Sequence, residues 1–178
     1  MNEFFKACIE DLWTTDAAQG QRFLHQVLPD GREEFCCLGL ICKKYIEMIG
    51  PLTVSVEDLK RPFADPEQPV TSGYKMVRYD GHVAGLPKSV QAALGIMSGL
   101  GRYQTKTGYC ALAYLNDSGR SFKEIARVME STSPTEWIDE RETLGPHLVP
   151  DSFAGLPHEV QATPWSGASP EQEGNDDA

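Results

Sequence analysis

Hydrophobic residues recur at helical spacing near the start of the chain and again after Phe35. The first stripe predicts a helix over residues 2–14, capped by Asn2. The second predicts a helix that opens at Cys36 or Cys37 and ends at Gly50-Pro51, because glycine accepts a positive φ and proline cannot continue a helix. Since its inward face is apolar throughout, we expect this second helix to be the most deeply buried.

A looser alternation of apolar and polar residues predicts a β-hairpin between these two helices. Residues 22–28 form its first strand, residues 29–32 suit a tight turn, and a short second strand passes through Phe35. Another strand is predicted over residues 74–79. The prolines and charges of residues 51–73 are typical of an irregular connection.

Three shorter helices are predicted in the second half of the chain. One covers residues 86–94 with proline in its first turn, and another covers residues 109–115. The last follows Ser121, which with Glu124 has the spacing of a capping box. Residues 116–119, Asn-Asp-Ser-Gly, are predicted to form the turn before it.

Together these elements predict a small, single α+β domain over residues 1–130, in which a β-hairpin packs on about four to five helices. The helical periodicity ends after Glu130. Residues 131–178 contain six prolines among many serines, glycines and acids, a composition that predicts a largely disordered acidic tail. Its predicted local anchors are Trp137, Ile138, Phe153 and Trp165.

The net charge of −10 belongs almost entirely to this tail. Residues 1–130 carry 16 acidic and 15 basic residues, whereas residues 131–178 carry 10 acidic residues and one basic residue, Arg141. A nearly neutral body has no surface suited to tracking phosphates, and an acidic tail repels them. We therefore expect no nucleic-acid partner.

The sequence shows no targeting signal and no apolar window of the roughly 18 residues that a membrane span requires. Its five cysteines cannot all pair with one another, and most fall on apolar helix faces. We therefore expect free thiols in a reducing compartment and no membrane association.

Cys36 and Cys37 are the candidate nucleophiles. A cysteine at a strand-to-helix junction lies where the helix dipole stabilises a thiolate, as in thiol hydrolases. The candidates for a base and for the residue that orients it are His25, His82, Asp80 and Asn116. The alternative is that the cysteines only pack, with Gly39 permitting a close approach of another segment. We favour packing, because small apolar residues explain the whole run from Cys36 to Cys42.

Other site types have weaker support in the sequence. Asp117 is a candidate acid or ligand, although Asn-Asp-Ser-Gly is also an ordinary turn. The adjacent pair Cys36-Cys37 lacks the spacing of a zinc knuckle, and on a helix Cys37 and Cys42 point about 140° apart. Glycine-rich phosphate loops and common catalytic signatures are not found. We therefore predict no metal site and no cofactor.

One segment of the body recurs in the tail. Ala84–Ala92 reads Ala-Gly-Leu-Pro-Lys-Ser-Val-Gln-Ala, and Ala154–Ala162 matches it at seven of nine positions. One interpretation is a local duplication without a present role. The other is a tail segment that mimics the body segment and occupies the groove that receives it, in the same chain or in a neighbouring one.

Three segments together resemble a family of small proteins encoded by tailed bacteriophages and prophages. They are Cys36-Cys-Leu-Gly-Leu-Ile-Cys42, Leu86-Pro-x-x-Val90 with Leu94-Gly95, and Leu115-Asn-Asp-x-Gly119-x-Ser-Phe122-x-x-Ile125-Ala126. The resemblance covers about residues 4–130 and implies a phage product in the host bacterial cytoplasm, without implying a reaction.

The leading hypothesis is a non-enzymatic phage accessory protein that binds a host protein or a small ligand; the sequence leaves its oligomeric state open. A second hypothesis is a thiol-dependent hydrolase or transferase that uses Cys36 or Cys37. A third is a protein that sequesters a nucleotide signal. Its scattered phosphate-binding candidates are Lys43, Lys44, Arg78 and Arg102.

Overall fold

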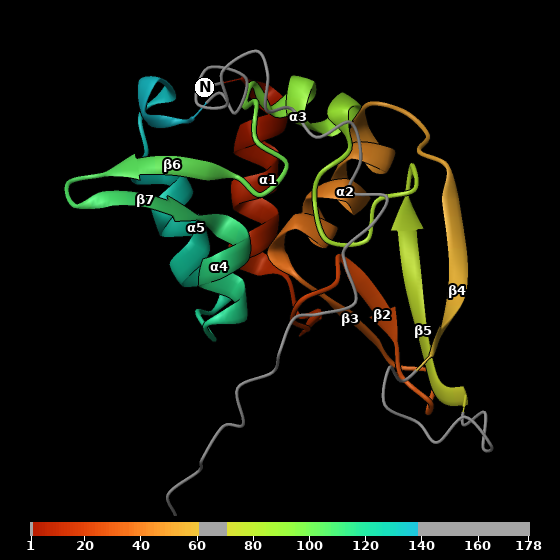
Figure 1. Ribbon diagram of the computed structural model, residues 1–178. Coiled ribbons are helices and arrows are strands. Elements are labelled where there is room, and N and C mark those ends of the chain that lie inside the picture. The colour runs from red at the N-terminus through yellow and green to blue at the C-terminus, as the bar shows by residue number, and fades with distance from the viewer. Residues whose placement is uncertain (1, 61–70, 139–178) are drawn as a thin grey trace, which may run out of the picture.

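The computed structural model describes residues 2–60 and 71–138 of the chain (Figure 1). These residues form five α-helices, a five-stranded sheet and a separate two-stranded hairpin, which confirms the α+β class. The predicted tail beyond residue 138, including Ala154–Ala162, lies outside the described residues.

The main sheet has the strand order β1-β3-β2-β5-β4. Its strands are β1 (Ala18–Gln19), β2 (His25–Val27), β3 (Glu33–Phe35), β4 (Val54–Lys60) and β5 (Thr71–Tyr79). The short β1 runs parallel to β3, and all other neighbours are antiparallel. The predicted hairpin is therefore confirmed as β2–β3, but it forms part of a larger sheet.

Strand β4 corrects the prediction of an irregular connection after residue 50. Prolines at positions 62, 66 and 69 dominated that prediction, whereas Val54-Ser-Val has the alternation and β-branched residues of a strand. Pairing with β5 supplies the ladder that the local sequence did not reveal.

Five helices pack beside the sheet. They are α1 (Glu3–Thr14), α2 (Cys37–Met48), α3 (Lys88–Leu94), α4 (Leu112–Asp117) and α5 (Phe122–Ser131), followed by a 3₁₀ turn, η1 (Pro134–Glu136). The predicted caps are confirmed: Asn2 accepts a hydrogen bond from the Phe5 amide, and Ser121 and Glu124 form a capping box.

The helix predicted over residues 109–115 is wrong in its first half. Residues Arg102–Thr105 (β6) and Gly108–Ala111 (β7) pair as an antiparallel hairpin, and α4 begins only at Leu112. Gly108 has a φ of 143°, a conformation that suits glycine and redirects the chain between the strands. Trp137 then packs edge-on against both Phe5 and Tyr103, as expected of a local anchor.

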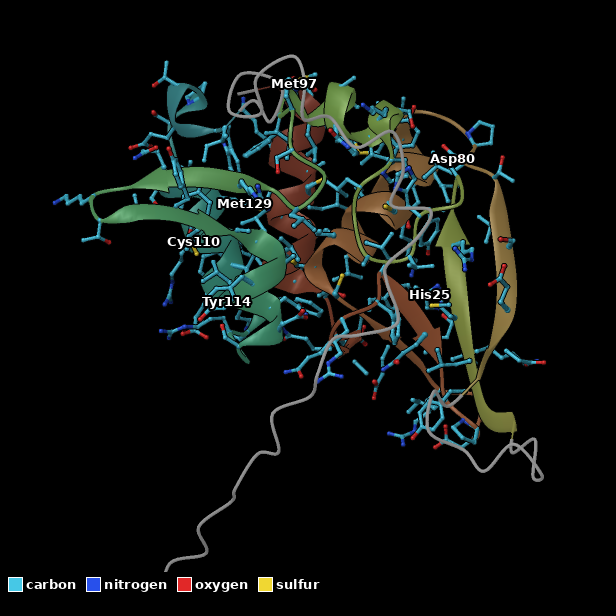
Figure 2. All side chains as sticks on the ribbon, viewed as in Figure 1. His25, Asp80, Met97, Cys110, Tyr114 and Met129 are labelled. Carbon is cyan, nitrogen blue, oxygen red and sulfur yellow. The ribbon has the colours of Figure 1, made fainter. Side chains whose placement is uncertain are left out.

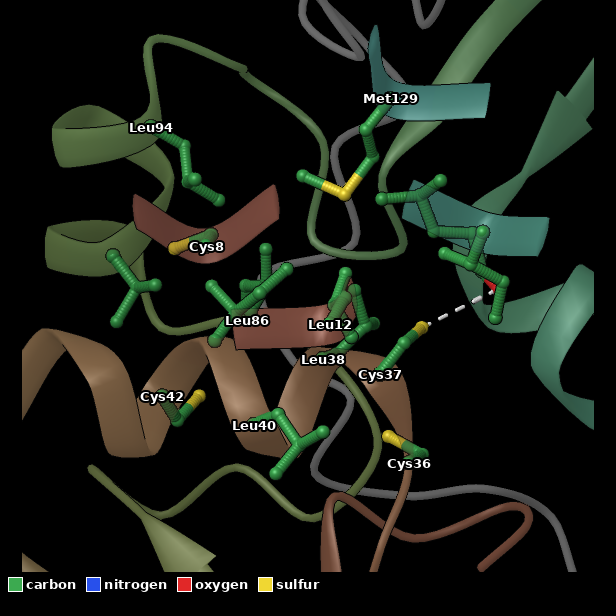
Figure 3. Close-up of a cluster of buried hydrophobic side chains, with 14 of the residues drawn as sticks. Cys8, Leu12, Cys36, Cys37, Leu38, Leu40, Cys42, Leu86, Leu94 and Met129 are labelled. Carbon is green, nitrogen blue, oxygen red and sulfur yellow. Dashed lines mark hydrogen bonds between the residues drawn. The ribbon is translucent and has the colours of Figure 1, made fainter. Parts of the chain in front are cut away.

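Helix α2 lies between the main sheet and α1, while α5 covers the opposite side of α1 (Figure 1). The first half of α2 is buried on every side, which confirms its predicted burial. Its Leu38 and Leu40 belong to the same buried core cluster as Leu12 of α1 and Leu86 (Figure 3).

Gly39 allows α2 to touch the strand layer. A Cβ atom at this position would collide with the backbone carbonyl of Leu24, the residue immediately before β2. The same carbonyl accepts a hydrogen bond from the Cys36 amide at 3.1 Å. The helix therefore starts in direct backbone contact with the sheet, and only glycine fits there.

We predict that Gly39→Ala destabilises the fold by about 3 kcal/mol or more, because the Leu24 backbone would have to move out of a packed core. Urea denaturation followed by circular dichroism measures the change. Gly50→Ala is the matched control, since a Cβ there meets nothing within 4 Å. Equal stability of the two variants would contradict this account.

Candidate functional site

Cys36 and Cys37 lie where β3 passes into α2, the junction at which the sequence placed its candidate nucleophiles (Figure 3). Cys36 is the N-cap residue, has an extended backbone and makes no capping hydrogen bond through its side chain. Both residues are buried, with exposed fractions of 5% and 0%. The junction has the predicted geometry, but a substrate has no access to either thiol in this state.

Burial also determines the ionisation of these thiols. It raises the pKa of Cys36 to about 12, although the nearby amides of Leu38 and Gly39 oppose the increase. It raises the pKa of Cys37 well above its usual range, and the Cys37 thiol donates to the Leu112 carbonyl, with an Sγ to O distance of 3.6 Å. Both thiols are therefore protonated near neutral pH in this state, and the thiolate is the nucleophilic form of cysteine.

His25 lies on β2, beneath the start of α2 (Figure 2). Its ring stacks on Phe35 with centroids 4.1 Å apart, and its Nδ1 is 3.1 Å from the Tyr79 hydroxyl. Its Nε2 is buried without a hydrogen-bond partner, 3.8 Å from a carboxylate oxygen of Glu33. Burial lowers the pKa of His25, an effect that Glu33 partly opposes, so the ring is neutral at pH 7.

The remaining predicted site residues lie elsewhere. His82 is exposed in the turn after β5, and its carbonyl accepts from the Tyr79 amide. Asp117 is exposed at the end of α4, where its Oδ1 accepts from the Arg22 amide at 2.8 Å. Within residues 2–60 and 71–138, no hydrogen bond joins a cysteine thiol to either imidazole.

Asn116, which the sequence analysis placed in a turn and among the candidates for a base or its orienter, has a structural role. Its side chain is completely buried at the end of α4. Its Oδ1 accepts from the Cys37 amide and from the Gln19 side chain, each at 3.1 Å, and its Nδ2 donates to the Gly20 carbonyl at 2.8 Å. One carboxamide therefore fixes both the start of α2 and the loop before β2. No sequence signal distinguishes this from an ordinary Asn-Asp turn.

This network joins two segments that lie far apart in the sequence. The Cys-Cys-Leu-Gly segment and the Leu-Asn-Asp segment meet through the bond between Asn116 and the Cys37 amide, across 79 positions of sequence. The contact is structural, since it satisfies an amide that the helix itself leaves without an acceptor.

Metal and phosphate chemistry find little support in the described part of the chain. It contains no group of three or more histidine, cysteine, aspartate or glutamate side chains placed to hold a metal ion. The cationic candidates are dispersed: Lys43 lies over the Phe35 ring, Lys44 pairs with Asp11 and Glu47, and Arg78 pairs with Glu57. Arg102 is on the separate hairpin.

A different feature stands out at the outer edge of the sheet. Five large apolar side chains near the end of α2 and in β4 are 37–55% exposed. They are Ile46, Met48, Ile49, Val54 and Val56, and we call them the α2–β4 surface. A five-residue connection, residues 49–53, joins the two elements.

No family model, curated protein or solved structure matches this chain. Within the described residues, no helix has the length and apolar character needed to cross a membrane.

We predict that Cys36 and Cys37 react with iodoacetamide at pH 6.5 far more slowly in the native protein than in urea, because both thiols are buried and protonated. Peptide mass spectrometry at successive times measures each site. Cys110, which is partly exposed, is the internal control and should react first. Rapid native labelling of Cys36 would instead support the thiol-enzyme hypothesis.

We also predict that His25 makes stability depend on pH. The pKa of His25 is lower in the folded state than the ordinary value of about 6.5 that it has in the unfolded chain. The unfolded chain therefore binds the proton first, and the free energy of unfolding should decrease as the pH falls below that value. In His25→Gln, urea titrations from pH 7.5 to 5 should show a flatter dependence. The same substitution at the exposed His82 is the control; an unchanged slope in His25→Gln would refute the prediction.

Proposed function

We propose that this chain is a non-enzymatic phage accessory protein that acts in the host bacterial cytoplasm and binds a host protein at the open edge of β4. The phage setting is supported by the motif resemblance. The binding role is supported by the α2–β4 surface, together with the buried, protonated state of the candidate nucleophiles.

The proposal rests on which backbone N–H and C=O groups of β4 point away from β5. The Thr53 carbonyl accepts from the Asp80 amide at 2.8 Å, so Thr53 directs its backbone groups toward the β5 side. Because successive residues of a strand direct these groups to opposite sides, Val54, Val56 and Asp58 present theirs at the outer edge. Among the described strands, β4 has a neighbour on one side only.

The side chains at this edge are unusually apolar. Val54 and Val56 stand opposite Tyr79 and Val77, so they share the sheet face that α2 covers, yet both are about half exposed. Natural edge strands are normally protected by charges, and here Glu57 and Asp58 protect only the later part of β4. The unprotected part is Val54-Ser-Val56.

These features fit an extended segment of a partner protein that adds to the sheet as a sixth strand. Main-chain hydrogen bonds to Val54 and Val56 would supply affinity, and apolar side chains at alternate positions would cover the valines. The exposed Asp58 favours a basic residue opposite it. The groove between α1 and α5 is less suitable, because a Trp13 to Glu130 hydrogen bond spans two of its lining residues.

We predict that Val56→Pro abolishes partner binding while leaving the fold intact, because the lost N–H points outward and not toward β5. Host proteins captured by immobilised wild type should be purified, and their affinity for wild type and variant compared by calorimetry. At least a tenfold weakening is expected, with Tyr109→Lys, which alters an exposed residue of β7, as the unaffected control.

Hydrogen exchange provides the second readout of the same experiment. Bound partner should slow exchange at the amides of Val54 and Val56 and leave α5 unchanged. The proposal is wrong if every captured protein binds Val56→Pro as tightly as wild type. It is also wrong if wild type and Val56→Pro capture the same set of proteins. Self-association that Val56→Pro abolishes would instead identify a second copy as the occupant.

A further inference from the structure

We propose that residues 154–162 are a spare copy of the α3 segment, able to occupy the α3 site of the same chain when α3 leaves it. The α3 site is the surface of α1 and α2 that α3 covers. The occupant is thus a named segment of this chain, and the structure shows why its sequence fits.

Every buried residue of the body copy is identical in the tail copy. Leu86 and Val90 are 0% exposed, Pro87 is also fully buried, and Gln91 is 8% exposed. All four recur in the tail as Leu156, Pro157, Val160 and Gln161. The two positions that differ, Lys88 and Ser89, are both exposed in the body copy.

All four buried residues of the body copy are therefore shared, and both changed residues face solvent; the exposed Ala84 and Ala92 are shared as well. A motif kept for recognition by an outside partner would show the opposite pattern, because the inward residues of α3 are inaccessible. This favours a tail segment that packs where α3 packs.

The shared residues also keep the internal structure of the segment. The Gln91 side chain donates to the Leu86 carbonyl at 2.7 Å, which closes the first turn of α3. Gln161 and Leu156 have the same spacing. Pro87 is the N-cap residue of α3, and Pro157 takes the same position in the tail copy.

The end of the described chain lies close to the α3 site. Trp137 packs on Phe5 with ring centroids 5.8 Å apart, near the start of α1. At the same end of α1, the Asn2 side chain donates to the Ala93 carbonyl of α3 at 2.8 Å. Fifteen residues separate Ile138 from Ala154; extended, they span roughly 50 Å, more than enough to reach the site.

The two copies are not equivalent in their last turn. Leu94 is buried and Gly95 ends α3 with a φ of 77°, whereas the corresponding tail positions are Pro164 and Trp165. The tail copy lacks both the last apolar anchor and the glycine cap. The α3 segment therefore binds the site more tightly than the tail copy in the intact protein. The spare copy takes over only when α3 is weakened or drawn away.

A double-mutant comparison in the full-length chain tests this inference. Leu156→Ala alone should leave the melting temperature unchanged, because α3 itself occupies the site in the unsubstituted chain. In a Leu86→Ala background, adding Leu156→Ala should lower it further, by roughly 4 °C or more. Glu159→Ala in the same background is the matched control and should have no effect, since position 159 corresponds to the exposed Ser89.

Hydrogen exchange distinguishes replacement from general stabilisation. In Leu86→Ala, residues 154–162 should gain protection while residues 84–92 lose it, independently of protein concentration. Concentration-dependent protection would mean exchange between two chains and would overturn the intramolecular form. If Leu86→Ala does not fold, Val90→Ala with Val160→Ala replaces the pair; equal melting temperatures with and without the tail substitution would refute the inference.

Discussion

A helix that begins inside a protein must find an acceptor for each of its first amide groups, and α2 finds one in a side chain from the far end of the domain. Cys36 stands at the N-cap without a capping hydrogen bond, so the buried carboxamide of Asn116 accepts from the Cys37 amide instead. The same carboxamide holds Gly20, which leads into β2. Helix α2, the sheet and the α4–α5 turn therefore depend on one polar contact.

The close approach at Gly39 also holds α2 against the sheet. Because the Leu24 carbonyl occupies the space of a missing Cβ, α2 sits directly on the sheet, and the residues around the contact lose their access to water. Cys36, Cys37 and His25 are all close to this contact. Their reactive atoms are buried by the packing that positions them, which raises the thiol pKa values and lowers that of the imidazole.

The opposite end of α2 is different. Its buried first half gives way to exposed apolar residues that continue into β4, where the sheet has an unpaired edge among the described strands. The first half of α2 thus lies in the core, and its last residues lie on the exposed α2–β4 surface. This division is the basis of the proposed partner binding at the sheet edge. The proposed association of the repeated tail segment would instead use the interior packing around α3.

The amino-acid sequence by itself determined the local elements whose signals are complete within a short window. The apolar stripes of α1 and α2, the cap at Asn2 and the Ser121–Glu124 box were predicted from spacing alone and are confirmed. Only the tertiary structure decided the rest. Strand β4 needs β5 to form its ladder, and the Asn116 contact joins residues 79 positions apart. Burial of Cys36 likewise depends on neighbours that no local pattern specifies, so its chemistry was settled by packing and not by its position at a helix start.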